Sequence, residues 1–345
     1  MTGHPAGDGV GPAAAAPWTL LALSPLPAEV LAMLFAEVPV ELVVPQARTP
    51  EATVAAAGAA ELLLGDWTGT LRVTADLVAA APRLVFVQQP SAGVDAIDVA
   101  ACAAAGITVA NSGDANAVSV AEWCVGATFA VMRSIPYADR EVRTGGWPQL
   151  EIAKRGGGEV TGRRVGIVGM GSIGRECATR YVALGCDVAF WSRTRRDPAQ
   201  AGGARWLELG DLLRHSEVLV VVIALADATR GLLGADQLAL LPPGGYLINA
   251  ARGGIVDEAA LLAAVRSGAL AGAALDVFAT EPLPDPHPLR DEDRIVLSPH
   301  TAGATAQAQA RLIQGIVANI RRAATGEPVR HVVNGLDPLI RRRSA

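Results

Sequence analysis

Short, nearly unbroken runs of apolar residues alternate with longer Ala-rich stretches along most of this chain. The first five runs cover residues 18–24, 40–45, 60–65, 83–89 and 107–112. A strand that helices cover on both faces is apolar on both sides, so such runs predict strands of a parallel sheet. The stretches between them are rich in Ala, Leu and Glu, which favour helices. The pattern therefore predicts βαβ repetition in an open α/β sheet.

A second α/β series follows a linking segment. The segment 117–143 has apolar residues at helical spacing and predicts one linking helix, and the Gly-rich stretch 154–159 separates it from the second series. The second series predicts strands over 163–170, 186–192, 217–224, 245–250, 270–278 and 294–298, and helices over 173–184, 257–267 and 304–324. At roughly 150 residues per domain, a chain of 345 residues suggests two domains. The last helix can fold back onto the first domain and make that domain discontinuous.

Composition excludes several classes of protein. Hydrophobic residues make up 51% and charged residues 18%, which is unlike a disordered or fibrous chain. The net charge of -5 offers no basic field for nucleic acid, and we interpret Arg341, Arg342 and Arg343 as a solvated tail. Four widely spaced cysteines predict neither a metal site nor a disulfide framework, and they favour a reducing cytoplasm.

The chain shows no signal for a membrane. Its longest strongly apolar stretch, 218–226, has about half of the roughly 20 residues that a membrane span needs. The first seventeen residues lack the basic start of a secretory signal, and Gly and Pro interrupt them. We therefore expect a soluble, cytoplasmic protein with a loose amino-terminal leader.

The strongest local motif is the glycine loop Gly169-Met170-Gly171-Ser172-Ile173-Gly174. It follows an apolar strand and opens a helix, the context that gives G-x-G-x-x-G its meaning. In such a loop the first glycine permits the turn, the second lets a pyrophosphate approach, and the third lets the helix pack on the strand. The amides at the helix N-terminus then face the anion. These six residues are predicted to bind a dinucleotide.

The next strand ends at the position that selects the cofactor. NAD binders usually place a carboxylate there, which accepts from the ribose hydroxyls and repels a 2′-phosphate. This chain has Ser192, Arg193 and Thr194 instead, with Arg195 and Arg196 next to them. A hydroxyl among guanidinium groups suits a phosphate ester, so we predict NADP(H) in preference to NAD(H). The alternative is that these arginines form a solvated loop.

Three further segments carry residues suited to moving a hydride and a proton at a 2-oxo acid. Arg252 follows a predicted strand directly, Glu281 lies in the segment ALDVFATEPLP, and His300 lies in SPHTAGAT. Each residue alone is weak evidence for catalysis, since a single His beside a Pro is more often an ordinary loop residue than a catalytic one.

Together with the glycine loop, these segments give a resemblance to a known family. The chain resembles the D-isomer-specific 2-hydroxyacid dehydrogenases over about residues 20–335, through the motifs GMGSIG, NAARGGIVDEAAL, ALDVFATEPLP and SPHTAGAT. The resemblance implies a Rossmann-type cofactor domain, 113–299, inserted in a flavodoxin-like substrate domain made of 1–112 and 300–345. It also implies an active site in the cleft between the domains and a homodimer formed through the cofactor domain.

The resemblance further implies roles for single residues. His300 would donate a proton as the ketone is reduced, Glu281 would stabilise the imidazolium, and Arg252 would hold the substrate carboxylate and polarise the keto oxygen. Backbone amides of the first domain would also bind that carboxylate, and other residues would join the cofactor site. The amides are those of Ala92, Gly93 and Val94, and the additional cofactor residues are Ala250, Asp276 and Gly303.

Some alternatives stay open. The family often has Pro-Leu-Thr where this chain has Ala224-Leu225-Ala226, so contacts near the adenosine half are in doubt. Glu281 argues against a formate dehydrogenase, which usually has Gln there, whereas a phosphite dehydrogenase keeps a similar trio. A corepressor-like protein that senses the dinucleotide could keep the whole site. Few aromatic residues (4%) and no basic cluster near Ser91–Asp95 favour a small acid such as glyoxylate or hydroxypyruvate over a phosphorylated one.

Overall fold

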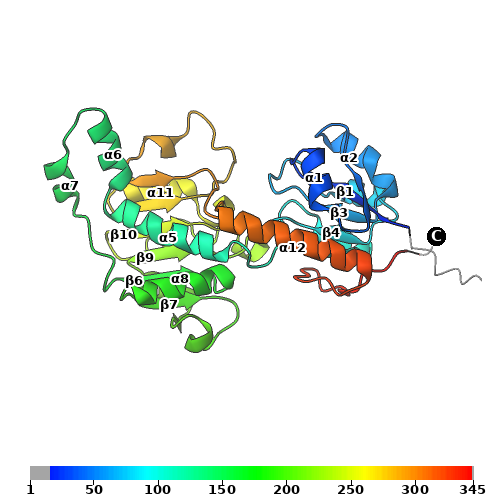
Figure 1. Cartoon of the computed structure of the whole chain (residues 1–345). Coiled ribbons are helices and arrows are strands. Elements are labelled where there is room, and N and C mark those ends of the chain that lie inside the picture. Colours follow the sequence, from blue (N-terminus) through cyan, green and yellow to red (C-terminus); the bar gives the residue numbers. More distant parts are fainter. Residues whose placement is uncertain (1–15, 344–345) are drawn as a thin grey trace, which may run out of the picture. The chain divides into compact units, whose positions relative to one another are not determined.

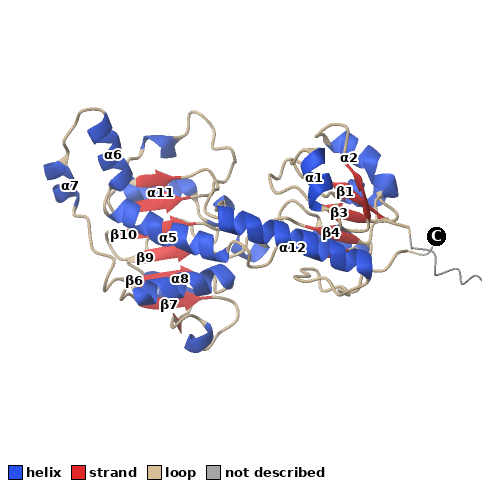
Figure 2. Cartoon of the chain, in the orientation of Figure 1, coloured by secondary structure: helices blue, strands red, loops and turns tan. Residues whose placement is uncertain are grey.

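The chain folds into two compact α/β units. The computed structural model describes residues 16–343, so nearly all of the predicted leader lies outside the described residues. The first unit runs to Gly113 and resumes at Ile313, and the second comprises Asp114–Leu312. In each unit, helices lie on both faces of a parallel sheet (Figure 1, Figure 2). The predicted fold class is confirmed.

The first unit has the strand order β2-β1-β3-β4-β5, which is the order of flavodoxin-like sheets. Every pair of neighbouring strands is parallel, and an apolar cluster covers each face. The strands are β1 (Trp18–Ala22), β2 (Val40–Val43), β3 (Leu62–Leu64), β4 (Phe86–Gln88) and β5 (Thr108–Ala110). The helices are α1 (Ala28–Leu34), α2 (Pro50–Ala56), α3 (Ala75–Ala80) and α4 (Val99–Ala104), together with the end of α12 (Ala306–Thr325).

Two of the three arginines predicted to form a solvated tail bind the first unit instead, whereas Arg341 is exposed. Arg342 donates to the carbonyl oxygens of Ala16 and Pro17 at 2.7 and 2.9 Å, and its Nε lies 3.1 Å from Oε1 of the buried Glu61. Arg343 donates to the carbonyl oxygens of Pro82 and Ala105 at 2.8 and 2.5 Å. These two side chains therefore fasten residues 342–343 to the first unit, which charge clustering alone could not predict.

The second unit has the strand order β12-β11-β10-β9-β6-β7-β8. Counted within the unit, β6 is the first strand and the order reverses between β6 and β9, as in the Rossmann fold. The strands are β6 (Arg164–Val168), β7 (Asp187–Trp191), β8 (Arg205–Trp206), β9 (Val218–Val221), β10 (Gly245–Asn249), β11 (Leu270–Leu275) and β12 (Ile295–Leu297). The helices are α5 (Ala117–Met132), α6 (Ile135–Arg143), α7 (Gln149–Arg155), α8 (Ser172–Ala183), α9 (Leu209–His215), α10 (Ala235–Leu238), α11 (Glu258–Arg266) and the start of α12.

The predicted linking helix is two helices. The chain leaves the helical conformation at Ser134, where φ is +50° and ψ is +35°, and α6 begins at Ile135 with Pro136 in its first turn. One unbroken helix cannot run through Pro136, because proline has no N–H to donate to the Met132 carbonyl oxygen and its ring would clash with that carbonyl group; in the first turn of a new helix neither constraint applies. Among residues 16–343, no single helix is long and apolar enough to cross a bilayer; α5 and α6 reach that test only as a pair, bent by 62°.

The second crossing between the units lies later than expected. The sequence places it near residue 300, whereas the structure places it between Leu312 and Ile313, inside α12. The backbone N–H groups of Thr301 and Ala302 both donate to the carboxylate of Asp276, at 2.8 Å each. The loop around His300 is therefore part of the second unit.

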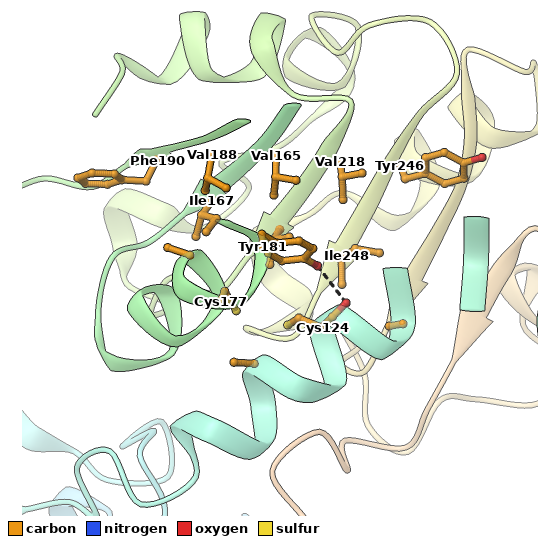
Figure 3. Packing of buried hydrophobic residues seen from close by; sticks show 14 of the residues in the cluster. Cys124, Val165, Ile167, Cys177, Tyr181, Val188, Phe190, Val218, Tyr246 and Ile248 are labelled. Carbon is orange, nitrogen blue, oxygen red and sulfur yellow. Dashed lines mark hydrogen bonds between the residues drawn. The ribbon is translucent and has the colours of Figure 1, made fainter. Parts of the chain in front are cut away.

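A buried tyrosine fastens α8 to α5 in the core of the second unit. Tyr181 is fully buried, and its hydroxyl donates to the Cys124 carbonyl oxygen at 3.1 Å (Figure 3). The same hydroxyl lies 2.6 Å from Oγ1 of Thr128. Burial raises the pKa of Tyr181 well above its usual value, so the phenol stays neutral. The two helices over this face of the sheet therefore share a polar contact in an otherwise apolar layer.

Replacing Tyr181 by Phe should destabilise the second unit by about 1 kcal/mol, which is the usual net contribution of one hydrogen bond. The loss should be no larger, because Thr128 keeps its own bond to the Cys124 carbonyl oxygen at 2.9 Å. Calorimetric unfolding measures the change. Tyr246→Phe is the control: its hydroxyl bonds to none of residues 16–343 in the structure, and its loss should cost less than about 0.5 kcal/mol. Equal losses in the two variants would show that the shared contact adds nothing.

Candidate functional site

The glycine loop joins β6 to α8, as the sequence predicts. Gly169 has φ +106°, a conformation that residues with a side chain rarely adopt. A Cβ on Gly174 would lie 2.1 Å from the Gly169 carbonyl oxygen, so α8 can approach the loop only with glycine there. Apart from its two chain neighbours, no atom of residues 16–343 lies within 4 Å of the position that a Cβ on Gly171 would take. The loop thus combines a tight turn with open space at its middle glycine.

The other residues of the motif differ in what they expose. Ser172 and Ile173 are half-buried in the first turn of α8, where the backbone N–H groups lack partners within the helix. The helix is 12 residues long and directs the positive end of its dipole at this turn. Met170 is only 2% exposed and packs in the core, so its backbone alone can reach a ligand.

The loop after β7 carries the predicted selectivity residues. Ser192 is half-buried, and its hydroxyl donates to the Thr194 carbonyl oxygen at 2.6 Å. Arg195 stacks on the Trp206 ring at 3.8 Å and lies 3.4 Å from Glu208. Arg193 and Arg196, which flank Thr194 and Arg195, are exposed and make no ion pair or hydrogen bond with any residue that the structure describes. Two guanidinium groups therefore remain available beside the end of β7.

His300 and Glu281 form a pair. His300 Nδ1 lies 2.7 Å from Glu281 Oε2, and both side chains are partly exposed. An ionised carboxylate only accepts hydrogen bonds, so Nδ1 donates, and Nε2 makes no hydrogen bond with any residue that the structure describes. The other carboxylate oxygen of Glu281 accepts from the Phe278 N–H at 2.9 Å. The carboxylate is thereby fixed to the backbone while it orients the imidazole.

Asp276 holds the loop that carries His300. It follows β11, is 1% exposed, and its carboxylate accepts from the Ser298 hydroxyl at 2.6 Å and from the N–H groups of Thr301 and Ala302. Its carbonyl oxygen accepts from the His300 N–H at 2.8 Å. His300 has φ +55°, which these bonds maintain. This supporting role was missed by the sequence analysis, and the expected contact of Asp276 with the nicotinamide stays a prediction.

Arg252 lies in the turn after β10. Its Nη1 donates to the Ala251 carbonyl oxygen at 2.7 Å, and the side chain is half-buried. Asn249, the last residue of β10, donates to the Arg252 carbonyl oxygen at 3.3 Å. A Cβ on Gly253 would lie 1.9 Å from the Phe278 carbonyl carbon, so the Arg252 turn packs directly on the segment that leads to Glu281. The turn that carries Arg252 and the segment that leads to Glu281 therefore lie against each other at one edge of the sheet.

The remaining predicted cofactor residues also lie at this edge. Ala250 follows β10 and is half-buried. Gly303 lies in the His300 loop against the Asn116 side chain, whose Nδ2 would be 2.8 Å from a Cβ on Gly303.

The segment 224–226, where the family often has Pro-Leu-Thr, is held by hydrogen bonds to Thr229. The Thr229 hydroxyl accepts from the Ala226 N–H and donates to the Ala224 carbonyl oxygen, both at 2.8 Å.

The loop with Ala92, Gly93 and Val94 follows β4 in the first unit. All three residues are half-buried, and their N–H groups donate to no acceptor within residues 16–343. Their carbonyl oxygens are all bound, those of Ala92 and Gly93 to side chains and that of Val94 to the Ile97 N–H. Successive free N–H groups form a concave site for an anion.

Sequence reasoning missed the residues that hold this loop. Asn111 and Ser112, which follow β5, donate to the carbonyl oxygens of Ala92 and Ser91, and no motif marks them. The available signal was their place at the end of a parallel strand next to β4, where polar side chains reach a neighbouring loop.

A family model matches residues 125–302 of the chain; it describes the NAD-binding domain of D-isomer-specific 2-hydroxyacid dehydrogenases. The chain is 38% identical over 264 residues to a D-3-phosphoglycerate dehydrogenase of Archaeoglobus fulgidus, a match that covers 76% of this chain and 50% of the relative. The chain thus spans about half the length of this relative.

A second relative is matched over more of its length. A glyoxylate/hydroxypyruvate reductase of Arabidopsis thaliana is 37% identical over 263 residues, which are 76% of this chain and 80% of the relative. Among solved structures, the apo form of D-mandelate dehydrogenase from Rhodotorula graminis has a TM-score of 0.83 at 26% identity, covering 92% of this chain and 98% of that one. Motifs, fold and relatives agree: the chain belongs to the D-isomer-specific 2-hydroxyacid dehydrogenase family.

Proposed function

We propose that this protein reduces a small 2-oxo acid to the D-2-hydroxy acid, with a nicotinamide dinucleotide as reductant. The observation that carries the proposal is the His300–Glu281 pair, with Nδ1 and Oε2 at 2.7 Å. The pair lies at the carboxyl edge of a sheet whose first turn is a dinucleotide loop, the edge at which ligands bind in open α/β folds.

The residues present fit a dinucleotide. Open space at Gly171, the close approach at Gly174 and the unpaired N–H groups at the start of α8 suit a pyrophosphate. When bound, the reduced nicotinamide supplies a hydride to carbon 2 of the substrate. Ala250, Asp276 and Gly303 are proposed to lie beside its ring.

The chain's own residues supply the proton and the charge. As carbon 2 becomes tetrahedral, negative charge develops on the former keto oxygen, and His300 Nε2–H donates its proton there. Glu281 stabilises the imidazolium before the transfer and orients the ring throughout. Arg252 is proposed to polarise the keto oxygen and bind the carboxylate with a charge that it keeps at neutral pH.

The amides of Ala92, Gly93 and Val94 are proposed to bind the same carboxylate. Their N–H groups are unpaired among the described residues, and their carbonyl oxygens are bound elsewhere, which suits them to an anion. An anion gains most from donors that are already oriented, because none of them has to reorganise on binding.

The surroundings of this loop favour a substrate without a phosphate. Arg48 is paired to the buried Asp66 at 2.7 Å and also donates to the Leu23 carbonyl oxygen. Arg72 donates to the Asp95 carbonyl oxygen at 2.7 Å. The charge of Arg48 is thus already paired within the first unit, so a phosphate could recruit this arginine only by breaking the ion pair with Asp66. Glyoxylate and hydroxypyruvate need no such partner, and this supports the reductase rather than the phosphoglycerate dehydrogenase activity.

The test is NADPH and NADH oxidation across glyoxylate, hydroxypyruvate, pyruvate, an aryl oxo acid and 3-phosphohydroxypyruvate. We expect turnover of the small acids and at least about tenfold lower kcat/KM for the phosphorylated one. His300→Asn should lower kcat on the best substrate by about 10² to 10⁴ and leave cofactor affinity nearly unchanged, because only the proton donor is lost.

His287→Asn is the matched control, because His287 also lies near a glutamate, Glu258, at 3.9 Å in the same unit. It should keep kcat within about twofold. Full activity of the His300 variant would overturn the mechanism. Phosphite oxidation without reduction of any oxo acid would favour a phosphite dehydrogenase, and tight cofactor binding without any turnover would favour a dinucleotide-sensing protein.

We also propose that NADP(H) is preferred over NAD(H). Arg193 and Arg196 have no partner among residues 16–343, and no carboxylate follows β7 at Ser192. A 2′-phosphate carries two negative charges near neutral pH, and guanidinium groups bind its oxygens with paired donors.

The variant Arg193→Ala/Arg196→Ala should raise KM for NADPH by about tenfold or more and change KM for NADH little. Steady-state kinetics with both cofactors provide the measurement. Arg214→Ala removes an exposed arginine that pairs with Asp211 and should leave both values unchanged. A wild-type protein that uses NADH more efficiently than NADPH would reject the preference.

Finally, we propose a homodimer through the second unit. Four apolar side chains on α6, α7 and the turn between them are exposed, and α7 lies at the outer edge of this unit in Figure 1. They are Ile135 (51%), Val142 (49%), Trp147 (79%) and Leu150 (76%). Exposed apolar side chains concentrated on one segment of the chain mark contact surfaces, and a second copy would cover them.

Wild-type protein should have twice the chain mass of 35.4 kDa by light scattering. The variant Trp147→Asp/Leu150→Asp should shift the protein toward the monomer, because charge would be buried in the interface. Met33→Asp, at a 71% exposed position of the first unit, should not. A wild-type monomer at micromolar concentration would contradict the proposal.

A further inference from the structure

In the loop after β4, three successive carbonyl oxygens, those of residues 91–93, each accept a hydrogen bond from another group of the protein. The Ser91 carbonyl oxygen accepts from the Ser112 N–H at 3.1 Å, and that of Gly93 accepts from the Ser91 hydroxyl at 2.9 Å. The Ala92 carbonyl oxygen accepts from Nδ2 of Asn111 at 2.7 Å. A peptide group whose oxygen is fixed on one side presents the N–H of the next residue on the other, since the two lie on opposite sides of the planar trans peptide. Among residues 16–343, Asn111 alone donates to the carbonyl oxygen of the peptide between Ala92 and Gly93.

Asn111 binds more than this loop. Its Oδ1 accepts from the Gly113 N–H at 3.0 Å, and its own N–H donates to the His331 carbonyl oxygen at 3.1 Å. Gly113 is the last residue before the chain crosses to the second unit, and its φ of +58° belongs to a turn. One side chain therefore joins the anion loop to the segment where the chain leaves the unit.

We propose that Asn111 is a positioning residue for the substrate carboxylate. Its amide nitrogen fixes the Ala92 carbonyl oxygen, which keeps the Gly93 N–H directed at the bound anion, and its amide oxygen fixes the turn at Gly113. Asn111 itself does not touch the carboxylate. The inference rests on the proposed function, because it takes that carboxylate to be the anion the loop binds.

The amide is needed because the two contacts are opposite in kind. Nδ2 must donate to a carbonyl oxygen and Oδ1 must accept from an N–H, and the side-chain amide of Asn carries both groups on one planar end. A carboxylate at this position would keep the bond to Gly113 and place an oxygen against the Ala92 carbonyl oxygen. Repulsion would turn that peptide, withdraw the Gly93 N–H and add a negative charge next to the anion site.

The experiment compares Asn111→Asp with Asn334→Asp in the full-length protein. Asn334 is matched: in the same unit its Oδ1 accepts from the Val109 N–H at 3.1 Å and its Nδ2 donates to the Ile107 carbonyl oxygen at 2.8 Å. Both variants place a carboxylate oxygen against a carbonyl oxygen and add one negative charge. Only the first does so beside the anion loop.

For Asn111→Asp we expect KM for glyoxylate to rise about tenfold or more, with kcat within about threefold and KM for NADPH unchanged, because a uniformly weakened carboxylate contact appears in KM. Binding of oxalate to the NADPH-loaded protein, followed by nicotinamide fluorescence, should weaken by a similar factor. Asn334→Asp should change neither value by more than about twofold. A general loss of stability would lower the melting temperature of both variants and would not separate KM from kcat.

Equal KM values for the Asn111→Asp variant and the wild-type protein, or equal effects of the two variants, would overturn the inference. If Asn111→Asp does not fold, Asn111→Ala decides, with an expected rise in KM of about threefold or more, since it removes the donor without adding charge. A wild-type protein that reduces no oxo acid but binds oxalate in an Asn111-dependent way would refute the proposed function and leave this assignment standing. A wild-type protein that fails to bind oxalate would refute the assignment.

Discussion

The buried carboxylate of Asp276 is the constraint on which the candidate site at the carboxyl edge of the second sheet depends. A carboxylate taken out of water is costly unless hydrogen bonds replace its hydration. Here the Ser298 hydroxyl and two backbone N–H groups supply them, and all three come from the loop that contains His300. The same loop places His300 at φ +55°, a conformation that costs of order 1 kcal/mol or more for a residue with a side chain. The bonds to Asp276 offset that cost, so the imidazole is held by the backbone before any ligand arrives.

Parallel pairing explains why residues so far apart in sequence share one edge. In the second unit Val168 pairs with both Trp191 and Val221, Asn249 pairs with Leu275, and Leu275 pairs with Leu297. Each of these residues ends or nearly ends its strand, so the residues that follow them emerge side by side. The glycine loop, the selectivity loop, the Arg252 turn, Asp276 and the His300 loop are therefore set by strand register, and the helices only have to return the chain to the other edge.

The sequence alone predicts the parts of this arrangement that depend on local chemistry. Continuous apolar runs predicted all strands of both sheets except the two-residue β8, and the glycine spacing placed the dinucleotide loop at the correct turn. What the sequence could not show depends on contacts between distant segments. Asp276 was expected beside a nicotinamide, but its use in holding the His300 loop appears only when β11 and the loop after β12 are adjacent. The bonds of Asn111 and Arg342 likewise connect residues 19 and more than 300 positions apart.

The contacts of Glu281 explain why a carboxylate, and not the isosteric amide, suits the proton donor that we propose at His300. Oε1 accepts from the Phe278 N–H, so an amide in this place would have to turn its oxygen to that N–H and its nitrogen to the imidazole. His300 Nδ1 would then face a donor and would have to accept, which is possible only for the neutral ring. Nε2 would still carry a hydrogen, but on a neutral imidazole it is a poor acid. The carboxylate instead accepts at both oxygens, so Nδ1 keeps its hydrogen and the ring can carry a second proton on Nε2. Because of the backbone bond from Phe278, Glu at residue 281 permits a charged imidazole at His300, whereas Gln would permit only a neutral one. The charged imidazole is the form that can donate the proton in the proposed reaction.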